Sequence, residues 1–439
     1  MSIKHTAWVR NPKILEINTW PWLNYLSETF NSKITLKSIP DEVLSQEIRY
    51  FDAIWFMGVW ERSPASKKIA LEHPDLQKEY RKALNDFKDE DVVGSPYSVY
   101  YYHVDKHIGG IDGLKAIRKK LSERNIRLIL DYVPNHVSVD SLWTFEPNLF
   151  IEGNLDNLMT HPYEFFSLSG KIFAYGRDPN FPPWTDTIQI NAFSKEARQK
   201  TIATLLNIAE LCDGVRCDMA MLMVNKIFNK TWGDKAGAPP DKEFWEEIIP
   251  SVKREFPNFL FIAEVYWDMQ WELQQQGFDL CYDKRLYERL AHENPNSIKE
   301  HLNAEWVYQS RFIRFIENHD ELRAVEEFGE EKSCAAAILA LTLPGARLVY
   351  EGQIRGYKTK LPVQLGRAAF EVENKNILEF YQNLLKSIPG REFENASWTL
   401  CKTQSFNSED NSYLNIISYL WWYNNNYRLI VVNYSPHPS

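Results

Sequence analysis

Four short stretches of this chain end an apolar run with acidic or imidazole side chains. They are residues 130–136, 214–218, 261–264 and 315–320. Removing a carboxylate from water is unfavourable unless a partner compensates, so buried strands seldom end in this way. Parallel barrels collect their reactive side chains at the C-terminal ends of several strands. The pattern therefore predicts acid–base chemistry by carboxylates that share one pocket at a barrel mouth.

Two of the carboxylates have surroundings that suit different roles. Arg216 and Asp218 stand two positions apart and so share one face of a strand. The neighbouring guanidinium favours the ionised carboxylate and keeps Asp218 available as a nucleophile, although an isolated pair of this kind would more simply be a structural ion pair. Glu264 follows an apolar run, which raises the pKa of a carboxyl as a proton donor requires. We therefore predict Asp218 as nucleophile and Glu264 as acid/base, with a buried, locally hydrogen-bonded glutamate as the alternative for Glu264.

Further polar groups are expected at the same rim. His319 and Asp320 end the seventh predicted strand, and a third acid there suits hydrogen bonding to sugar hydroxyls in the transition state. The alternative for His319 is a histidine that only supports its neighbours. His136 ends the third strand and is expected to reach a substrate hydroxyl, whereas Asp131 is expected to hold Arg216 or nearby backbone.

Repeated apolar runs separated by amphipathic stretches predict the elements that position these residues. The eight predicted strands are residues 14–18, 53–57, 127–133, 214–218, 259–264, 278–282, 312–317 and 347–350. Residues 111–124 and 195–212 are typical of outer helices. The fold class predicted is α/β, a (β/α)8 TIM barrel with an insertion after the third strand.

The chain divides into three predicted parts. Residues 1–136 and 192–386 form the catalytic barrel, residues 137–191 the insertion domain, and residues 387–439 a small C-terminal antiparallel β domain. Three strand-like pieces are too few for a free-standing sandwich. Two interpretations stay open: the β domain is incomplete at Ser439, or its strands pack onto the barrel.

Composition excludes several classes of function. The chain has 439 residues, a formal net charge of −9 and no basic cluster, so neither nucleic acid nor a membrane is an expected partner. The start lacks the apolar stretch of a signal peptide, which predicts a cytoplasmic protein. The 5 cysteines have no Cys-x-x-Cys spacing, so neither a zinc site nor a disulfide framework is predicted.

The four stretches resemble the four short motifs of the α-amylase family of glycoside hydrolases. Residues 51–60, 94–97, 343–345 and 350–352 are also similar to family segments, in the expected order. The resemblance covers roughly residues 10 to 390. It implies a (β/α)8 barrel and a retaining mechanism.

The resemblance also implies roles for individual residues. Asp218 would be the nucleophile, Glu264 the acid/base and Asp320 the transition-state stabiliser. The residues that would line the cleaved sugar's subsite are Tyr97, His136, Arg216 and His319. Some members bind calcium at the position of Asn135, but no Asp-x-Asp-x-Asp-Gly loop surrounds it, so no required metal or other cofactor is predicted.

The leading hypothesis is a retaining enzyme that cleaves α-glucosidic bonds in α-glucans or maltooligosaccharides. One alternative is a transglycosidase with the same site, which transfers a glucosyl or maltosyl group or isomerises the sugar. The other is a noncatalytic sugar-binding barrel, since fold alone does not prove activity. That alternative predicts loss of a catalytic carboxylate, and none is lost.

Overall fold

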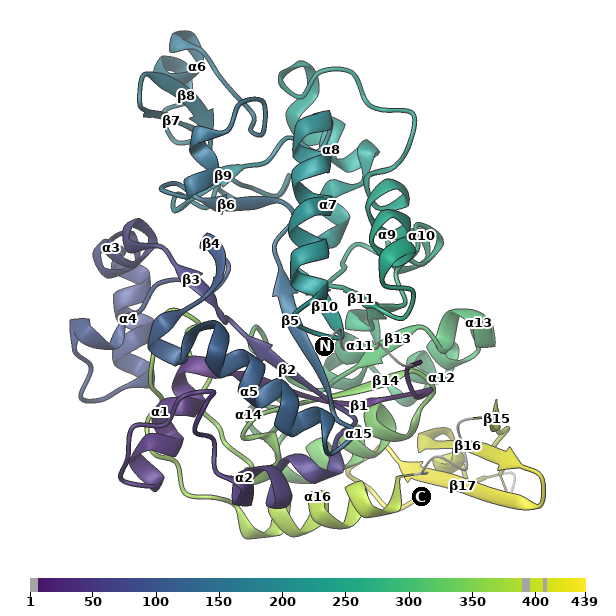
Figure 1. The fold of residues 1–439 in the computed structure, drawn as a ribbon. Helices are drawn as coiled ribbons and strands as arrows, with labels where there is room; N and C mark the ends of the chain where they lie inside the picture. Colours follow the sequence, from purple (N-terminus) through teal and green to yellow (C-terminus); the bar gives the residue numbers. More distant parts are fainter. Residues whose placement is uncertain (1–6, 389–394, 406–408) are drawn as a thin grey trace.

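A closed barrel of eight parallel strands forms the centre of the molecule (Figure 1). The computed structural model describes residues 7–388, 395–405 and 409–439. In chain order the barrel strands are β1 (Lys13–Asn18), β2 (Ala53–Met57), β5 (Arg127–Tyr132), β10 (Gly214–Cys217), β11 (Leu260–Ala263), β12 (Leu280–Tyr282), β13 (Phe312–Arg314) and β14 (Ala346–Tyr350). Their continuous apolar runs reflect burial on both faces, as in β2, where every residue is buried. The predicted barrel and its eight strands are confirmed.

Helices alternate with the strands and cover the outside of the barrel (Figure 1). The two predicted outer helices are α5 (Gly110–Ser122) and α7 (Lys195–Ala209). In α5 the buried residues Leu114, Ile117 and Leu121 recur at intervals of three and four and so face the strands. The other helices are α1 (Thr19–Thr29), α2 (Asp41–Gln46), α3 (Pro64–Glu72), α4 (Pro74–Ala83), α8 (Asn225–Trp232), α9 (Phe244–Glu255), α10 (Gln270–Gln275), α11 (Lys284–His292), α12 (Pro295–Leu302), α13 (Trp306–Gln309), α14 (Ala324–Phe328), α15 (Glu330–Thr342) and α16 (Lys375–Ser387). Within the described ranges, none has the length and hydrophobicity of a membrane-spanning helix.

Several barrel strands are shorter than predicted at the end that carries the acids. β10 stops at Cys217 and β11 at Ala263, so Asp218 and Glu264 are the first residues after their strands. The strand predicted at 312–317 ends at Arg314, which corrects its boundary by three residues. The reason is lateral pairing: β13 matches only Ile313 and Arg314 to β14, and a local apolar run does not reveal where a neighbouring strand ends.

The chain between β5 and α7 forms a separate small structure at the barrel mouth. It contains β6 (His136–Ser138), α6 (Leu155–Thr160), β7 (Phe165–Leu168), β8 (Lys171–Ala174) and β9 (Thr187–Gln189). β6 pairs with β9 and β7 with β8, both antiparallel. A hydrophobic cluster that includes Val137, Trp143, Phe150 and Ile188 lies beneath them. In Figure 1 this insertion stands above the barrel, although its domain boundaries remain a prediction.

Three C-terminal strands form an antiparallel sheet beside α15. They are β15 (Ser397–Leu400), β16 (Ile416–Tyr423) and β17 (Asn426–Asn433), yellow in Figure 1. The Trp421 indole donates to the carbonyl of Thr342 at the end of α15 (2.8 Å), and the Tyr434 hydroxyl donates to the carbonyl of Leu290 (2.7 Å). The sheet therefore packs onto the helical layer, as one of the two interpretations expected. The predicted ranges 1–136 and 387–439 include residues 1–6, 389–394 and 406–408, which lie outside the described residues.

Candidate active site

One buried guanidinium connects two of the candidate catalytic acids. Arg216, on β10, is fully buried and points into the barrel mouth. Its Nη1 lies 2.6 Å from Asp218 Oδ1, and its Nη2 lies 2.7 Å from Glu264 Oε2. The two carboxylates come from adjacent strand ends, as the parallel pairing of β10 with β11 requires. The structure thus places Asp218 and Glu264 side by side around a single positive charge.

Aromatic rings surround that guanidinium. Its central carbon lies 5.4 Å from the ring centre of Trp55, 5.1 Å from that of Tyr97 and 5.7 Å from that of Tyr282. Burial by itself would lower the pKa of Arg216, but Glu264 and the nearby phenols raise it well above its ordinary value. Arg216 therefore stays charged and forms ion pairs with both Asp218 and Glu264.

Glu264 has the character of a proton donor. Burial raises the pKa of Glu264 to about 7, with Asp218 and Asp320 adding to the rise and Arg216 opposing it. Its Oε2 accepts a hydrogen bond from the Met219 backbone N–H (2.7 Å), and its Oε1 accepts one from the Tyr266 hydroxyl (2.8 Å). Met219 adopts a left-handed backbone (φ 40), which turns its N–H toward Glu264. Two adjacent acids with different surroundings are an arrangement suited to separate nucleophile and acid roles.

A second group of charged side chains is centred on His319. Its Nε2 lies 2.9 Å from Asp320 Oδ2 and 2.8 Å from the Tyr97 hydroxyl, and its Nδ1 contacts the Glu16 carboxylate of β1. Burial would lower the pKa of His319, but Asp320 and Glu16 together raise it well above the usual value. Removal from water would raise the pKa of Asp320, whereas His319 and Arg216 hold it below the ordinary value. The pair is thus an imidazolium beside an ionised carboxylate.

The ring of Tyr97 lies over His319. The two ring centres are 5.3 Å apart and the planes differ by 28°, and Tyr97 also faces Arg216. Tyr97 belongs to the loop before β4 (Val99–Val104), so a loop from outside the barrel strands completes the rim.

The third strand end supplies structural and substrate-facing groups. The Asp131 carboxylate accepts hydrogen bonds from the Trp55 indole (3.0 Å) and the Gly58 backbone N–H (2.9 Å), so it holds nearby structure rather than Arg216. Gly58 needs a left-handed backbone (φ +73), and a Cβ there would lie 2.9 Å from both Arg62 and Pro96. His136 is buried against Trp184, with ring centres 5.1 Å apart. Burial lowers the pKa of His136, which leaves a neutral imidazole near Asp218.

Both oxygens of Asn135 already take part in hydrogen bonds. The Gln189 side-chain amide donates to Asn135 Oδ1 (2.9 Å) and to the Asn135 carbonyl (2.9 Å), so both oxygens already have a donor. Among the described residues, no group of three or more His, Cys, Asp or Glu side chains could hold a metal. That no cofactor is required remains a prediction.

Two adjoining hollows lead away from the acids. One, of about 300 Å³, is lined by Met219 and Tyr266 beside Glu264 and by the exposed rings of Phe181 and Trp267. The other, of about 440 Å³, includes Asp320 and Lys360. Both share Lys284, Arg285 and Glu288 in their walls. A ligand bound at the acids could therefore extend along the surface on this side.

The sequence analysis missed four residues of the site: Glu16, Trp55, Tyr266 and Tyr282. Tyr282 accepts a hydrogen bond from Arg216 Nε (3.3 Å), and Trp55 lies edge-on to His319. Glu16 had a related signal in the sequence: it is a carboxylate inside the buried apolar run of β1, whereas in the other four stretches the polar residues end the run. The seven predicted residues are brought to one rim, while their chemical roles remain predictions.

Three comparisons with known proteins agree with this fold. Residues 75–154 match the family model of the alpha amylase catalytic domain. The alpha-amylase MalA of Haloarcula japonica is 24% identical over 275 residues, which cover 59% of this chain and 36% of that protein. The alpha-1,4-glucan:maltose-1-phosphate maltosyltransferase of Picrophilus torridus is 20% identical over 370 residues, covering 79% of this chain and 52% of that one. The chain thus spans about half or less of the length of these relatives.

A solved structure extends the likeness over nearly the whole fold. The maltogenic alpha-amylase AmyB of Thermotoga neapolitana superposes with a TM-score of 0.64 at 20% identity, over 96% of this chain and 86% of that one. This likeness shows a shared architecture, and the family model and the curated relatives add the sequence evidence. The chain is thus similar in sequence and in fold to members of the α-amylase family of glycoside hydrolases.

Proposed function

We propose that the chain is a retaining enzyme that acts on α-glucosidic bonds of short maltooligosaccharides. The observation that carries the proposal is the bridge formed by Arg216 between Asp218 and Glu264, at 2.6 and 2.7 Å. A retaining mechanism needs two carboxyl groups about 5 to 5.5 Å apart, one as nucleophile and one as acid. A shared guanidinium is consistent with such close spacing.

In the first step Asp218 attacks the anomeric carbon of the sugar. Its Oδ1 is held by Arg216, which leaves Oδ2 to form the new bond. The glycosidic C–O bond breaks, and Glu264 gives its proton to the departing oxygen. That proton belongs on Oε1, because Oε2 already accepts from Arg216 and from Met219. The product is a covalent glycosyl ester on Asp218.

In the second step Glu264 acts as a base. It takes a proton from water or a sugar hydroxyl, whose oxygen attacks the anomeric carbon while the bond to Asp218 breaks. Two inversions restore the original α configuration. Asp320 and the charged His319 are suited to hydrogen-bond the sugar hydroxyls, and the half-buried ring of Tyr97 to contact the sugar ring.

Transfer to a sugar acceptor is the second candidate reaction. The hollow beside Glu264 is lined by Phe181 and Trp267, whose side chains are 67% and 39% exposed. Flat exposed rings suit an acceptor sugar, and one relative is named a maltosyltransferase. Hydrolysis is the reaction we favour, and both reactions use the same covalent intermediate.

The experiment is product analysis on maltose, trehalose, sucrose, maltoheptaose and pullulan. Release of glucose or maltose from the α-1,4 substrates is the expected result. Products longer than the substrate would establish transfer as the main reaction. If no member of the panel is converted, the proposed activity is wrong and the noncatalytic alternative stands.

A further inference from the structure

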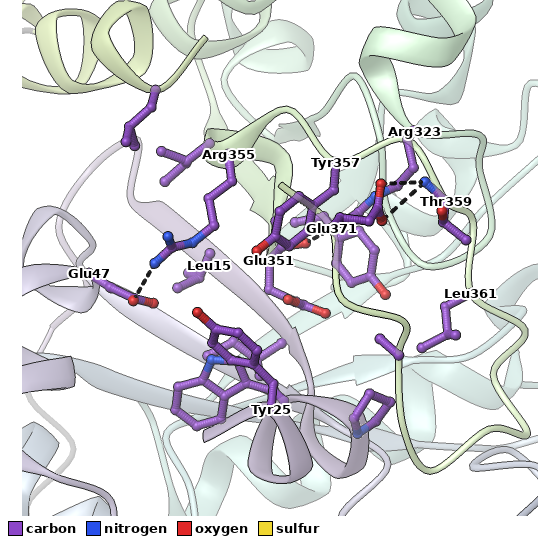
Figure 2. A pocket seen from close by; sticks show the side chains of 18 of the residues that line it. Leu15, Tyr25, Glu47, Arg323, Glu351, Arg355, Tyr357, Thr359, Leu361 and Glu371 are labelled. Atoms are coloured by element: carbon purple, nitrogen blue, oxygen red, sulfur yellow. Dashed lines mark hydrogen bonds and ion pairs between the residues drawn. The ribbon is translucent and has the colours of Figure 1, made fainter. Parts of the chain in front are cut away.

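A separate hollow, here called the outer cavity, lies on the other side of β1. It has a volume of about 310 Å³ and is enclosed by α1, the end of α2 with the turn that follows it, and the loop 351–371 (Figure 2). Leu15 and Ile17 line it, while Glu16 between them contacts His319 inside the barrel. The barrel wall therefore separates the outer cavity from the catalytic acids.

Aromatic rings form much of the cavity wall. Trp22 and Tyr25 come from α1, Tyr50 from the turn after α2, and Tyr357 from the loop after β14. Phe370 stands at the same hollow and is 83% exposed. Flat rings with hydroxyl groups suit ligands that have an apolar face and polar edges.

Polar groups without protein partners converge inside it. Figure 2 shows Glu351, Tyr25 and Tyr357 around the same space. Throughout the described ranges, neither the Glu351 carboxylate nor these two hydroxyls has a hydrogen-bond or ion-pair partner. Burial raises the pKa of Tyr357 to about 12, with Arg355 opposing the rise and Tyr25, Glu351 and Glu371 adding to it. These groups are thus close enough to act on one another and are available to a ligand.

The charge pattern of the lining disfavours anionic ligands. Arg355 is already bound to Glu47 (2.5 Å) and Glu373 (3.0 Å), and Arg323 to Glu317 (3.0 Å). An anion would meet the carboxylates of Glu28, Glu351 and Glu371 in the cavity lining, while both guanidinium groups are already paired. A molecule with several hydroxyls and no negative charge avoids this penalty, since hydroxyls both donate to carboxylates and accept from phenols.

We propose that the outer cavity is a second binding site for one or two glucosyl units of a short α-glucan. Its volume is at the lower end of the range of ligand pockets, about 300 to 1,000 Å³, which suits one or two sugar rings. The choice of sugar as ligand rests on the proposed function, whereas the hydroxyl-rich, non-anionic character of the ligand rests on the cavity alone.

Hydrogen–deuterium exchange of the full-length Asp218→Asn variant with millimolar maltotriose tests this site by location. The variant is used because it should retain bound sugar without turnover. Two separate regions of slowed exchange are expected: residues 218–223 and 264–270 beside the acids, and α1 with residues 352–357 beside the outer cavity. Titration of maltotriose gives an affinity for each region.

Variants of the cavity lining make the test specific. Three substitutions are made in the Asp218→Asn background: Tyr25→Phe, Tyr357→Phe and Glu351→Gln. Each should weaken the maltotriose affinity measured from protection of α1 by about 2- to 12-fold. The affinity measured from residues 264–270 should stay the same. Matched controls are Tyr163→Phe and Glu255→Gln, both exposed and outside the cavity lining. They should change neither region.

The outcomes separate this proposal from the proposed function. Protection limited to the peptides around Asp218 and Glu264 would overturn the second site and leave the proposed activity intact. Protection of α1 that survives all three cavity substitutions would also overturn it. If unmodified enzyme converts no α-glucoside but maltotriose still protects α1 in a cavity-dependent way, the second site stands and the proposed activity fails.

Discussion

The barrel rim and the outer cavity lie on opposite faces of β1 and differ in how their charged side chains are paired. At the rim each charged group has a buried partner of opposite sign: Arg216 has Asp218 and Glu264, and His319 has Glu16 and Asp320. In the outer cavity, Glu351 has no such partner within the described part of the chain.

This difference indicates two kinds of site. Paired charges fix side-chain positions and protonation states before a substrate arrives, which favours catalysis. Unpaired polar groups around apolar rings gain their partners only from a ligand, which favours binding. Substitutions at the rim should therefore lower activity strongly, and substitutions in the outer cavity should act on binding and stability.

The largest effect is expected from Asp218→Asn. Asparagine keeps the shape of the side chain but cannot form the covalent ester, so kcat should fall by about 10⁴-fold or more. Binding of maltotriose, measured by calorimetry, should persist. Asp156→Asn in the exposed part of α6 is the matched control and should be fully active. Turnover by Asp218→Asn within tenfold of the unmodified enzyme would remove Asp218 from the mechanism.

Glu16→Gln should give the next largest effect. It removes one of the two carboxylates that keep His319 charged, so the pKa of His319 should fall and a neutral imidazole should appear at a lower pH. We expect kcat to fall about 10-fold or more, as for loss of a charged hydrogen bond. The decisive readout is a new decline of kcat at alkaline pH. If the variant yields less folded enzyme but the pH dependence of kcat is unchanged, Glu16 stabilises the fold and does not keep His319 charged.

The pH profile should also report Glu264. Because burial raises its pKa to about 7 and the acid must be protonated to donate, kcat/KM should decline as pH rises through about 7. Tyr266→Phe removes a donor to the ionised form, so this decline should move to higher pH by less than about one unit. Tyr163→Phe should leave the profile in place. A shift to lower pH would contradict the assigned hydrogen bond.

The smallest effect is expected from Glu351→Gln in the outer cavity. Burial raises the pKa of Glu351, with Arg323 opposing the rise and Glu47 and Glu16 adding to it. A carboxyl group whose pKa is higher in the folded state than in the unfolded state destabilises the folded state when it ionises. This destabilisation grows as pH rises from the pKa of the unfolded state to that of the folded state. Glutamine removes this penalty, so the free energy of unfolding should increase by less than about 1 kcal/mol at pH 8, and less at pH 4. Urea unfolding at both pH values measures it, and a loss of stability at pH 8 would show that the carboxylate has a partner.

Much of the fold could be predicted because the barrel strands carry local signals. The apolar runs that form β2 and β14 are bounded by turn residues and can be read without knowing their neighbours. The end of β13 could not be predicted from the sequence, because it depends on how far β12 and β14 extend alongside it. Strand existence is thus a local property here, whereas strand length is set by pairing.

The candidate site shows a similar division. Asp218 and Glu264 were found because acids that end apolar runs stand out in the sequence. The bridge from Arg216 to Glu264 could not be found, since it joins side chains of adjacent strands 48 positions apart. The outer cavity was also missed, because it depends on how α1 packs against a loop more than 300 residues away in the chain.

The most direct test of the central claim is the anomeric configuration of the first product. Proton NMR of maltotriose hydrolysis, recorded before mutarotation is complete, distinguishes the two anomers. The pairing of Asp218 as nucleophile with Glu264 as acid/base predicts that the α anomer appears first and the β anomer only later. Initial release of the β anomer would show inversion and would contradict a covalent intermediate on Asp218.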